Sequence, residues 1–246
     1  MATQVWAHRG ASAYAPENTM DAFILAYEMG AQGVELDVHL SADGHVIVAH
    51  DDTLERVSDG RGYIKDRTLA ELRALRFSAG LKEFPDARMP TLEEVYAFAA
   101  PRSLIVNVEL KTNEFEYEGL AKKLIDLERS MGMAGLVWYS SFNHYSLLEV
   151  READPGARIG LLYGYRLLEP WRYAAQARAE ALHPEFRIPA YFPGYMGRCR
   201  DAGVRVHPYT PDSPKDIERL VRLGVDAVIT NRPDVALEVV SHAAQI

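Results

Sequence analysis

The chain has 246 residues, 48% of them hydrophobic and 25% charged, and its formal net charge is −8. This acidic balance argues against a protein that works on nucleic acid or at an anionic membrane, since both select a basic surface. Cys199 is the only cysteine, which excludes an internal disulfide bond. The length is close to the roughly 250 residues of one (β/α)8 barrel, so we expect a single domain, covering residues 1–246.

The first residues show no secretory pattern, because Met1 to Ala7 contain neither a basic segment nor an apolar one. No apolar run approaches the ~20 residues that span a bilayer. We therefore expect a cytoplasmic protein without stable membrane insertion. Any anionic substrate must then be held by local positive groups.

Short runs rich in β-forming residues alternate with amphipathic stretches, a pattern typical of parallel strands joined by crossover helices. Thr91 with Glu94 forms a capping box at a helix start, and Ser213-Pro214 is a helix N-cap followed by proline. Gly224 suits a helix end. The predicted strands are 4–8, 33–40, 45–49, 104–110, 136–140, 158–163, 180–183, 204–209 and 227–230. These are nine strands, one more than the eight of a (β/α)8 barrel.

The extra strand is one of the pair 33–40 and 45–49, which only four residues separate. Parallel strands need a crossover of about a dozen residues, so these two must be antiparallel. Taking Asp43-Gly44 as a two-residue turn places Asp37 directly opposite His50. The prediction is an α/β fold, a single (β/α)8 TIM barrel with an extra antiparallel hairpin arm after strand 2.

One long segment, about residues 53–88, separates the hairpin arm from the next helix. It contains a second capping box, Thr68 with Glu71. Its apolar residues are too few for a core of its own. We expect a small insertion over the barrel mouth.

Polar side chains stand at the C-terminal ends of the first predicted strands, where the active sites of such barrels lie. They are His8 and Arg9 after the first strand, Glu35 and Asp37 in the second, and Glu109 and Lys111 in the strand at 104–110. Side chains alternate between the two faces of a strand, so Glu35 and Asp37 lie on the same face of their strand. For the same reason, Glu109 and Lys111 share a face of theirs. Buried carboxylates are costly unless they are paired or metal-bound. Three from neighbouring strands suit one divalent cation, Mg²⁺ or Ca²⁺.

Two histidines, three carboxylates and two cationic side chains around one mouth favour phosphoester chemistry. Cations neutralise the phosphate oxygens, and imidazoles move protons at neutral pH. No glycine-rich P-loop, Gly-x-Ser-x-Gly motif or cysteine-based zinc spacing competes with this interpretation.

Four segments of the sequence resemble the glycerophosphodiester phosphodiesterases, a family of phospholipase-C-like phosphodiesterase barrels. They are His8-Arg9-Gly10 with Ala15-Pro16-Glu17-Asn18-Thr19, Gly33-Val34-Glu35-Leu36-Asp37-Val38, His50-Asp51-Asp52-Thr53-Leu54-Glu55-Arg56, and Asn107-Val108-Glu109-Leu110-Lys111. Weaker similarity follows at Ser140-Ser141-Phe142, Tyr209-Thr210 and 224–231. The similarity therefore covers the whole chain and is densest before residue 112.

The resemblance implies that a small glycerophosphodiester is hydrolysed to an alcohol and sn-glycerol 3-phosphate by histidine general acid–base catalysis. It implies catalytic roles for His8 and His50, a cation bound by Glu35, Asp37 and Glu109, and substrate contacts at Arg9, Lys111 and Tyr209. One departure follows Tyr209-Thr210, where Pro211-Asp212 replaces the usual valine and asparagine. Asp212 would add negative charge near the mouth and bears on the choice of leaving group.

Other functions remain open at this point. A non-catalytic barrel could bind a phosphorylated metabolite with the same cationic residues. An amidohydrolase would need His-x-His ligand spacing, which the sequence lacks. A phospholipase acting on membrane lipids would need an apolar or basic rim. The acidic balance weighs against it, although Phe84, Phe192 and Tyr195 could form a modest apolar lip.

Some of the same residues also have structural interpretations. Glu35 and Asp37 could form an interior ion-pair cluster with Lys111, and Arg9 could brace the end of the barrel. Asn18 is predicted to cap a helix. His39 is predicted to contact solvent beyond the barrel rim.

Overall fold

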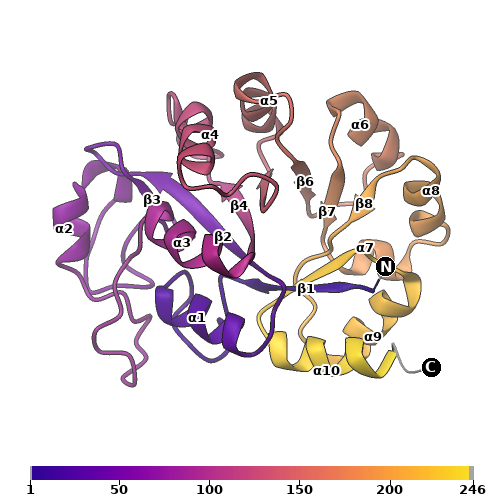
Figure 1. Ribbon diagram of the computed structural model, residues 1–246, viewed down its shortest axis with the longest axis horizontal. Coiled ribbons are helices and arrows are strands. Elements are labelled where there is room, and N and C mark those ends of the chain that lie inside the picture. Colours follow the sequence, from indigo (N-terminus) through magenta and orange to yellow (C-terminus); the bar gives the residue numbers. More distant parts are fainter. Residues whose placement is uncertain (1, 244–246) are drawn as a thin grey trace.

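The computed structural model describes residues 2–243, and in it eight parallel strands form a ring surrounded by helices (Figure 1). The hydrogen-bonded order is β8-β7-β6-β5-β4-β2-β1-β9. Backbone bonds from Ile229 N to Pro208 O and from Asp226 N to Val206 O, both 3.0 Å, link the two ends of this order. The strands are β1 Gln4–His8, β2 Gly33–Leu40, β4 Ile105–Leu110, β5 Val137–Ser141, β6 Ile159–Tyr163, β7 Ala181–Pro184, β8 Arg205–Val206 and β9 Ala227–Thr230. The predicted (β/α)8 barrel is confirmed.

The helices lie outside the strands (Figure 1), and three of them begin at predicted capping residues. Thr91 and Thr68 each form a capping box, Ser213 caps the helix that starts at Pro214, and Gly224 ends that helix with a φ of +75°. The α-helices are α1 Met20–Glu28, α2 Leu69–Arg73, α3 Leu92–Ala99, α4 Leu120–Ser130, α5 His144–Ala153, α6 Pro170–Ala177, α7 Arg187–Tyr191, α8 Tyr195–Asp201, α9 Pro214–Leu223 and α10 Pro233–Ala243. Within residues 2–243, no helix has both the length and the apolar character needed to cross a membrane.

One strand is much shorter than predicted. β8 comprises Arg205–Val206, although 204–209 was expected to be extended. Pro208 has no backbone N–H, so it cannot donate to a neighbouring strand. Tyr209 nevertheless bridges to Glu185 and Ile229, and this contact keeps the segment in the ring.

The hairpin arm is confirmed, but its predicted register is wrong by one residue. β3 Val46–Val48 pairs antiparallel with β2, and Val38 lies opposite Val48. Ser41 N donates to His45 O, so three residues rather than two form the loop, and Gly44 has a φ of +81°. A left-handed residue closing a three-residue loop is a common hairpin form. The residue that pairs with Asp37 is therefore Ala49, whose N–H donates to Asp37 O, and His50 lies one position beyond.

The insertion packs against the hairpin arm through a small apolar cluster. The cluster consists of Ile47 of β3, the flanking residues Ala49 and Met89, and, from the insertion, Leu54, Val57, Ile64, Leu72 and Phe77. The apolar residues of the insertion are thus buried together with the hairpin arm rather than in a core of their own. The insertion borders the mouth on the β2 side, where Arg56 hydrogen-bonds to Glu17 and Asp51. Tyr63 also stacks edge-on against Phe115, with ring centroids 5.2 Å apart.

Aromatic and imidazole rings fill the barrel interior below the mouth. His207 Nδ1 lies 3.0 Å from His183 Nε2, and both rings pack near Trp6 and Trp138. Burial lowers the pKa of His183 to about 3 and that of His207 well below its usual value, so both rings are neutral. Their role is to fill the core.

Gly160 on β6 leaves the space that the His183 ring fills. We therefore expect any side chain at position 160 to destabilise the fold. A Cβ at Gly160 would lie 2.2 Å from His183 Nε2. We expect Gly160→Ala to lower the free energy of unfolding by roughly 1–3 kcal/mol through overpacking. Gly197→Ala is the matched control, because a Cβ there meets nothing within 4 Å and lies in helix α8. Urea unfolding of the two variants that gave equal stability would contradict this packing.

Candidate active site

A cavity of about 220 Å³ opens at the C-terminal ends of the strands. It is lined by His8, Arg9, Glu35, His50, Asn107, Glu109, Phe142, Leu162, Tyr209, Thr210 and Ile229. Six of the eight predicted site residues are in this lining. The other two, Asp37 and Lys111, lie directly behind it, since Lys111 Nζ is 2.9 Å from Glu109 Oε1 and 3.6 Å from Asp37 Oδ1.

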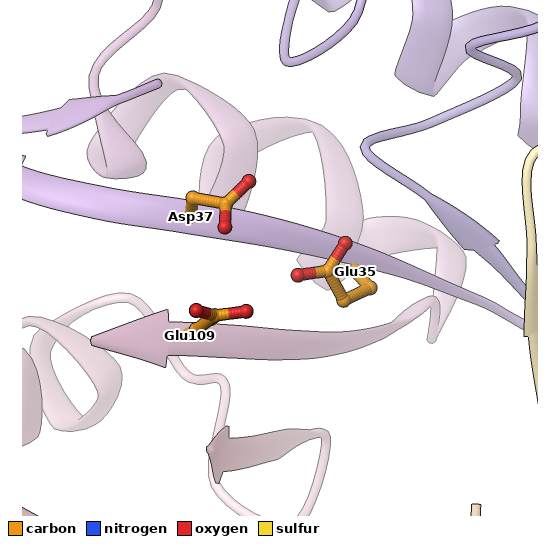
Figure 2. Close-up of side chains that lie close together, drawn as sticks. All are labelled: Glu35, Asp37 and Glu109. Atoms are coloured by element: carbon orange, nitrogen blue, oxygen red, sulfur yellow. The ribbon is translucent and has the colours of Figure 1, made fainter. Parts of the chain in front are cut away.

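Three carboxyl groups meet on neighbouring strands beside this cavity. Figure 2 shows Glu35 and Asp37 on β2 and Glu109 on β4, with their carboxyl groups close together. One oxygen from each residue lies within 4.8 Å of the others, and all three residues are buried. Their proximity follows from the parallel register, in which Asp37 pairs with Glu109. This geometry can hold one divalent cation.

Burial and mutual repulsion make the three carboxyl groups unlike one another. Burial, followed by repulsion from the Asp37 charge, raises the pKa of both glutamates. The pKa of Glu109 rises to about 7, and that of Glu35 rises well above its usual value. Burial would also raise the pKa of Asp37, but Lys111 and Arg9 outweigh it and hold that pKa at about 2. Asp37 Oδ1 is buried without a hydrogen-bond partner. A cation at this position would satisfy that oxygen and offset the repulsion, so the donor set fits a hard metal ion.

Arg9 leaves β1 with its backbone in the left-handed region, at a φ of +56°. This conformation lets its N–H donate to Glu35 Oε2 at 3.0 Å, while its guanidinium reaches two acids. Nη1 lies 2.9 Å from Glu17 Oε1, and Nε lies 3.4 Å from Asp37 Oδ2. Arg9 thus braces the rim and also presents positive charge to the cavity that it lines.

His8 is connected to the last strand of the barrel through an amide. Its Nδ1 lies 2.7 Å from Asn231 Oδ1. The Asn231 amide orientation is fixed, because its Nδ2 donates to Asp212 Oδ2 at 2.7 Å. Oδ1 therefore accepts, and His8 must carry its hydrogen on Nδ1. Burial lowers the pKa of His8 to about 4, which leaves Nε2 as a free acceptor at neutral pH.

His50 is held by a carboxylate instead. Its Nδ1 lies 2.7 Å from Asp51 Oδ1, and Arg56 Nε pairs with the other oxygen of Asp51. Hydrogen bonds from Arg56, followed by that of His50, hold the pKa of Asp51 well below its usual range. Although His50 is not the cross-strand partner of Asp37, it lines the same cavity as His8.

The prediction for His39 was wrong, because its side chain is completely buried. His39 Nδ1 contacts Tyr117 OH at 3.0 Å, and its Nε2 lies 3.3 Å from the backbone oxygen of His50. His39 shares a face with Glu35 and Asp37, so alternation alone could have placed it inside. It supports the segment that carries His50.

The prediction for Asn18 was also wrong, because Thr19 caps helix α1. The φ of Asn18 is +57°, and its Nδ2 donates to Asp37 Oδ2 at 2.8 Å. Its partner is the central carboxylate of the site. Asparagine adopts this left-handed conformation more readily than most residues, but nothing in the sequence marked Asp37 as its acceptor.

Asp212 does not present a free charge to the mouth. Its carboxylate accepts hydrogen bonds from Thr230 Oγ1 at 2.9 Å and from both the backbone and the side-chain nitrogen of Asn231. Asp212, where the sequence departs from the family pattern, thus orients Asn231, and Asn231 in turn orients His8. Sequence reasoning missed Asn231 as well, although it closes the weakly similar segment 224–231.

One part of the cavity lining forms a largely apolar wall. Tyr209 stacks edge-on against Phe142, with ring centroids 5.9 Å apart, and Leu162 and Ile229 complete this wall. The three candidates for an apolar lip, Phe84, Phe192 and Tyr195, do not all reach the surface. Tyr195 is buried and its hydroxyl bonds to that of Tyr163.

Comparison with known proteins shows the family to which the chain is similar. The model of the Glycerophosphoryl diester phosphodiesterase family matches residues 8–235. The chain is 42% identical to a glycerophosphodiester phosphodiesterase of Caldanaerobacter subterraneus subsp. tengcongensis, over 98% of both chains.

Solved structures give the same result. A glycerophosphodiester phosphodiesterase from Agrobacterium tumefaciens superposes with a TM-score of 0.85 at 28% identity, covering 96% of this chain and 99% of that one. An Oleispira antarctica phosphodiesterase in complex with the product sn-glycerol-3-phosphate superposes with a TM-score of 0.83 at 28% identity, covering 98% and 97%.

Proposed function

The chain belongs to the glycerophosphoryl diester phosphodiesterase family and is a phosphoric diester hydrolase, and we propose that it hydrolyses glycerophosphodiesters to an alcohol and sn-glycerol 3-phosphate. The observation that carries this proposal is the cavity lined by His8, His50, Glu35 and Glu109, with Asp37, the third buried carboxyl group, directly behind it. The product named in the Oleispira antarctica complex supports the choice of substrate.

Glu35, Asp37 and Glu109 would hold one divalent cation, Mg²⁺ or Ca²⁺. When bound, that ion would neutralise charge on the non-bridging oxygens of the phosphate. Arg9 and Lys111 carry the other positive charges at the site, and they would hold the phosphate in place. Tyr209 would contact the rest of the substrate from the apolar wall.

The two histidines have different partners and would therefore have different roles. His8, with Nδ1 committed to Asn231, would accept the proton of the nucleophile on Nε2. His50, with Nδ1 on the Asp51 carboxylate, would donate the proton that the departing alkoxide needs. The nucleophile is either water or the glycerol hydroxyl of the substrate, which would give a cyclic phosphate first.

We further propose that the whole chain, residues 1–246, acts as one cytoplasmic domain on a small molecule rather than on nucleic acid. The net charge of −8 supports this view. The positive groups of the site are local and paired with acids, as in Arg9 with Glu17.

A coupled assay for glycerol 3-phosphate tests this function directly. Purified protein is offered a panel of glycerophosphodiesters with Mg²⁺, with Ca²⁺ and with EDTA. We expect release from at least one substrate in the presence of a cation and loss of that release with EDTA. If no substrate is cleaved with either cation, the barrel is a binding protein and the proposal fails.

A further inference from the structure

A second and larger cavity opens beside the catalytic one. It has a volume of about 750 Å³ and is lined by Phe142, His144, Leu162, Tyr163, Gly164, Tyr165, Leu167, Leu168 and Tyr173. We call it the aromatic groove. Most of its lining comes from the ends of β5 and β6 and from residues 164–169, which join β6 to α6 (Figure 1). The groove is therefore at the same end of the barrel as the site.

The aromatic groove has no charged lining. Its described residues include no carboxylate and no lysine or arginine. His144 is neutral, because burial lowers its pKa and both ring nitrogens are engaged, one with Tyr173 OH and one with Leu162 O, each at 2.9 Å. A ligand that fills this groove is held by apolar contact.

Two residues of the groove are far more exposed than is usual for their type. Tyr165 is 85% exposed and Leu168 is 92% exposed. Phe142, Leu167 and Tyr173 are each more than a third exposed. A contiguous exposed patch of large apolar side chains around a cavity is a feature of ligand-binding surfaces.

The groove is continuous with the catalytic cavity. Phe142 and Leu162 line both cavities, and the Phe142 ring packs edge-on against Tyr209. A substrate whose phosphodiester lies between His8 and His50 can therefore extend along this shared wall into the groove. The occupant is then part of the substrate itself.

Building on the proposed function, we propose that the aromatic groove binds a hydrocarbon chain of the substrate, so that glycerophosphodiesters carrying one acyl or alkyl chain are preferred. Three leucines and the absence of charged side chains among the lining residues favour an apolar chain. Four aromatic rings also line the groove, and aromatic rings can hold a quaternary ammonium group, so the test below includes a head-group outcome. The net charge of −8 disfavours docking on an anionic bilayer. The substrate would therefore bind as a single molecule.

A chain-length series tests the proposal. Choline release is measured from glycerophosphocholine and from derivatives with acyl chains of increasing length, each kept below its micelle concentration and supplied with Mg²⁺ or Ca²⁺. Because the head group is constant, only the chain varies. We expect kcat/KM to rise with length, by at most about fourfold for each fully buried methylene, until the groove is filled.

Two variants locate the effect. In the double variant Tyr165→Ser, Leu168→Ser, the ratio of kcat/KM for the longest chain to kcat/KM for glycerophosphocholine should fall by roughly tenfold. Leu223→Ser is the matched control, because Leu223 is also an exposed leucine but ends α9, outside the groove lining. Its ratio should stay at the wild-type value.

The possible failures are distinguishable. Hydrolysis of glycerophosphocholine without any gain from the chain would overturn the groove proposal and leave the proposed function intact. A gain that appeared only with vesicles would overturn it in favour of binding at a lipid surface. A parallel series varies the head group of unacylated glycerophosphodiesters, and a head-group preference that the double variant abolishes, without any gain from the chain, would assign the groove to the head group instead. No choline release from any substrate would overturn the groove and count against the proposed function.

Discussion

His50→Ala is expected to lower kcat for an alkyl diester such as glycerophosphocholine by roughly 10²- to 10⁴-fold, the contribution of one positioned acid–base group. The same variant should lose much less on the p-nitrophenyl diester of glycerol phosphate. Nitrophenolate departs without being protonated, so it does not need the acid. Single-turnover rates on the two substrates measure this difference.

His8→Ala should behave differently, because a base is needed whatever group departs. Both substrates should lose roughly 10²- to 10⁴-fold. Asp212→Ala, which frees the Asn231 amide, should follow His8→Ala in direction with a smaller loss on both substrates. His45→Ala is the control, since His45 is half-exposed on the hairpin loop. Equal sensitivity of His8→Ala and His50→Ala to the leaving group would contradict the assignment.

The second large effect is expected at the carboxylate cluster. Glu109→Gln should reduce activity by more than the roughly 10- to 100-fold that outer-shell partners of a metal contribute, since it removes a proposed ligand. EDTA should have a comparable effect on the wild-type protein, reversed by adding Mg²⁺ or Ca²⁺. Full activity of the variant, or of the chelated wild type, would contradict the metal site.

The same variant should change how stability depends on pH. The folded-state pKa of Glu109 is raised by burial to about 7, against about 4.3 in an unfolded chain. A carboxyl group with a raised pKa favours folding while it is protonated, and this contribution is lost as the pH rises through the folded-state value. Between about pH 5 and pH 8, metal-free wild type should therefore lose roughly 2 kcal/mol relative to Glu109→Gln. Urea unfolding of both proteins, with EDTA present, measures this quantity.

Much of the barrel could be predicted because its signals are local. Short β-rich runs, two capping boxes and the Ser213-Pro214 pair mark elements that the structure places within a residue of prediction, apart from β8. Glu35, Asp37 and Glu109 follow from strand alternation and strand-end position. These features depend on residues close in sequence.

The missed features depend on geometry that the sequence does not encode locally. Asp43-Gly44 fits both a two-residue and a three-residue loop, and the choice moves His50 by one position. The contact of Asn18 with Asp37 joins the loop after β1 to β2, and that of Asn231 with His8 joins the two ends of the ring. A polar residue in a loop looks the same whether it caps a helix or supports a catalytic group.

The bond between His8 and Asn231 spans 223 positions of the chain. It joins β1, the first strand of the ring in chain order, to the residue that follows β9, the last strand of the ring. A ribosome-bound chain that has displayed every predicted catalytic and metal-binding residue still lacks the group that orients His8. The role proposed for His8 therefore depends on ring closure, a long-range contact of the kind that slows folding.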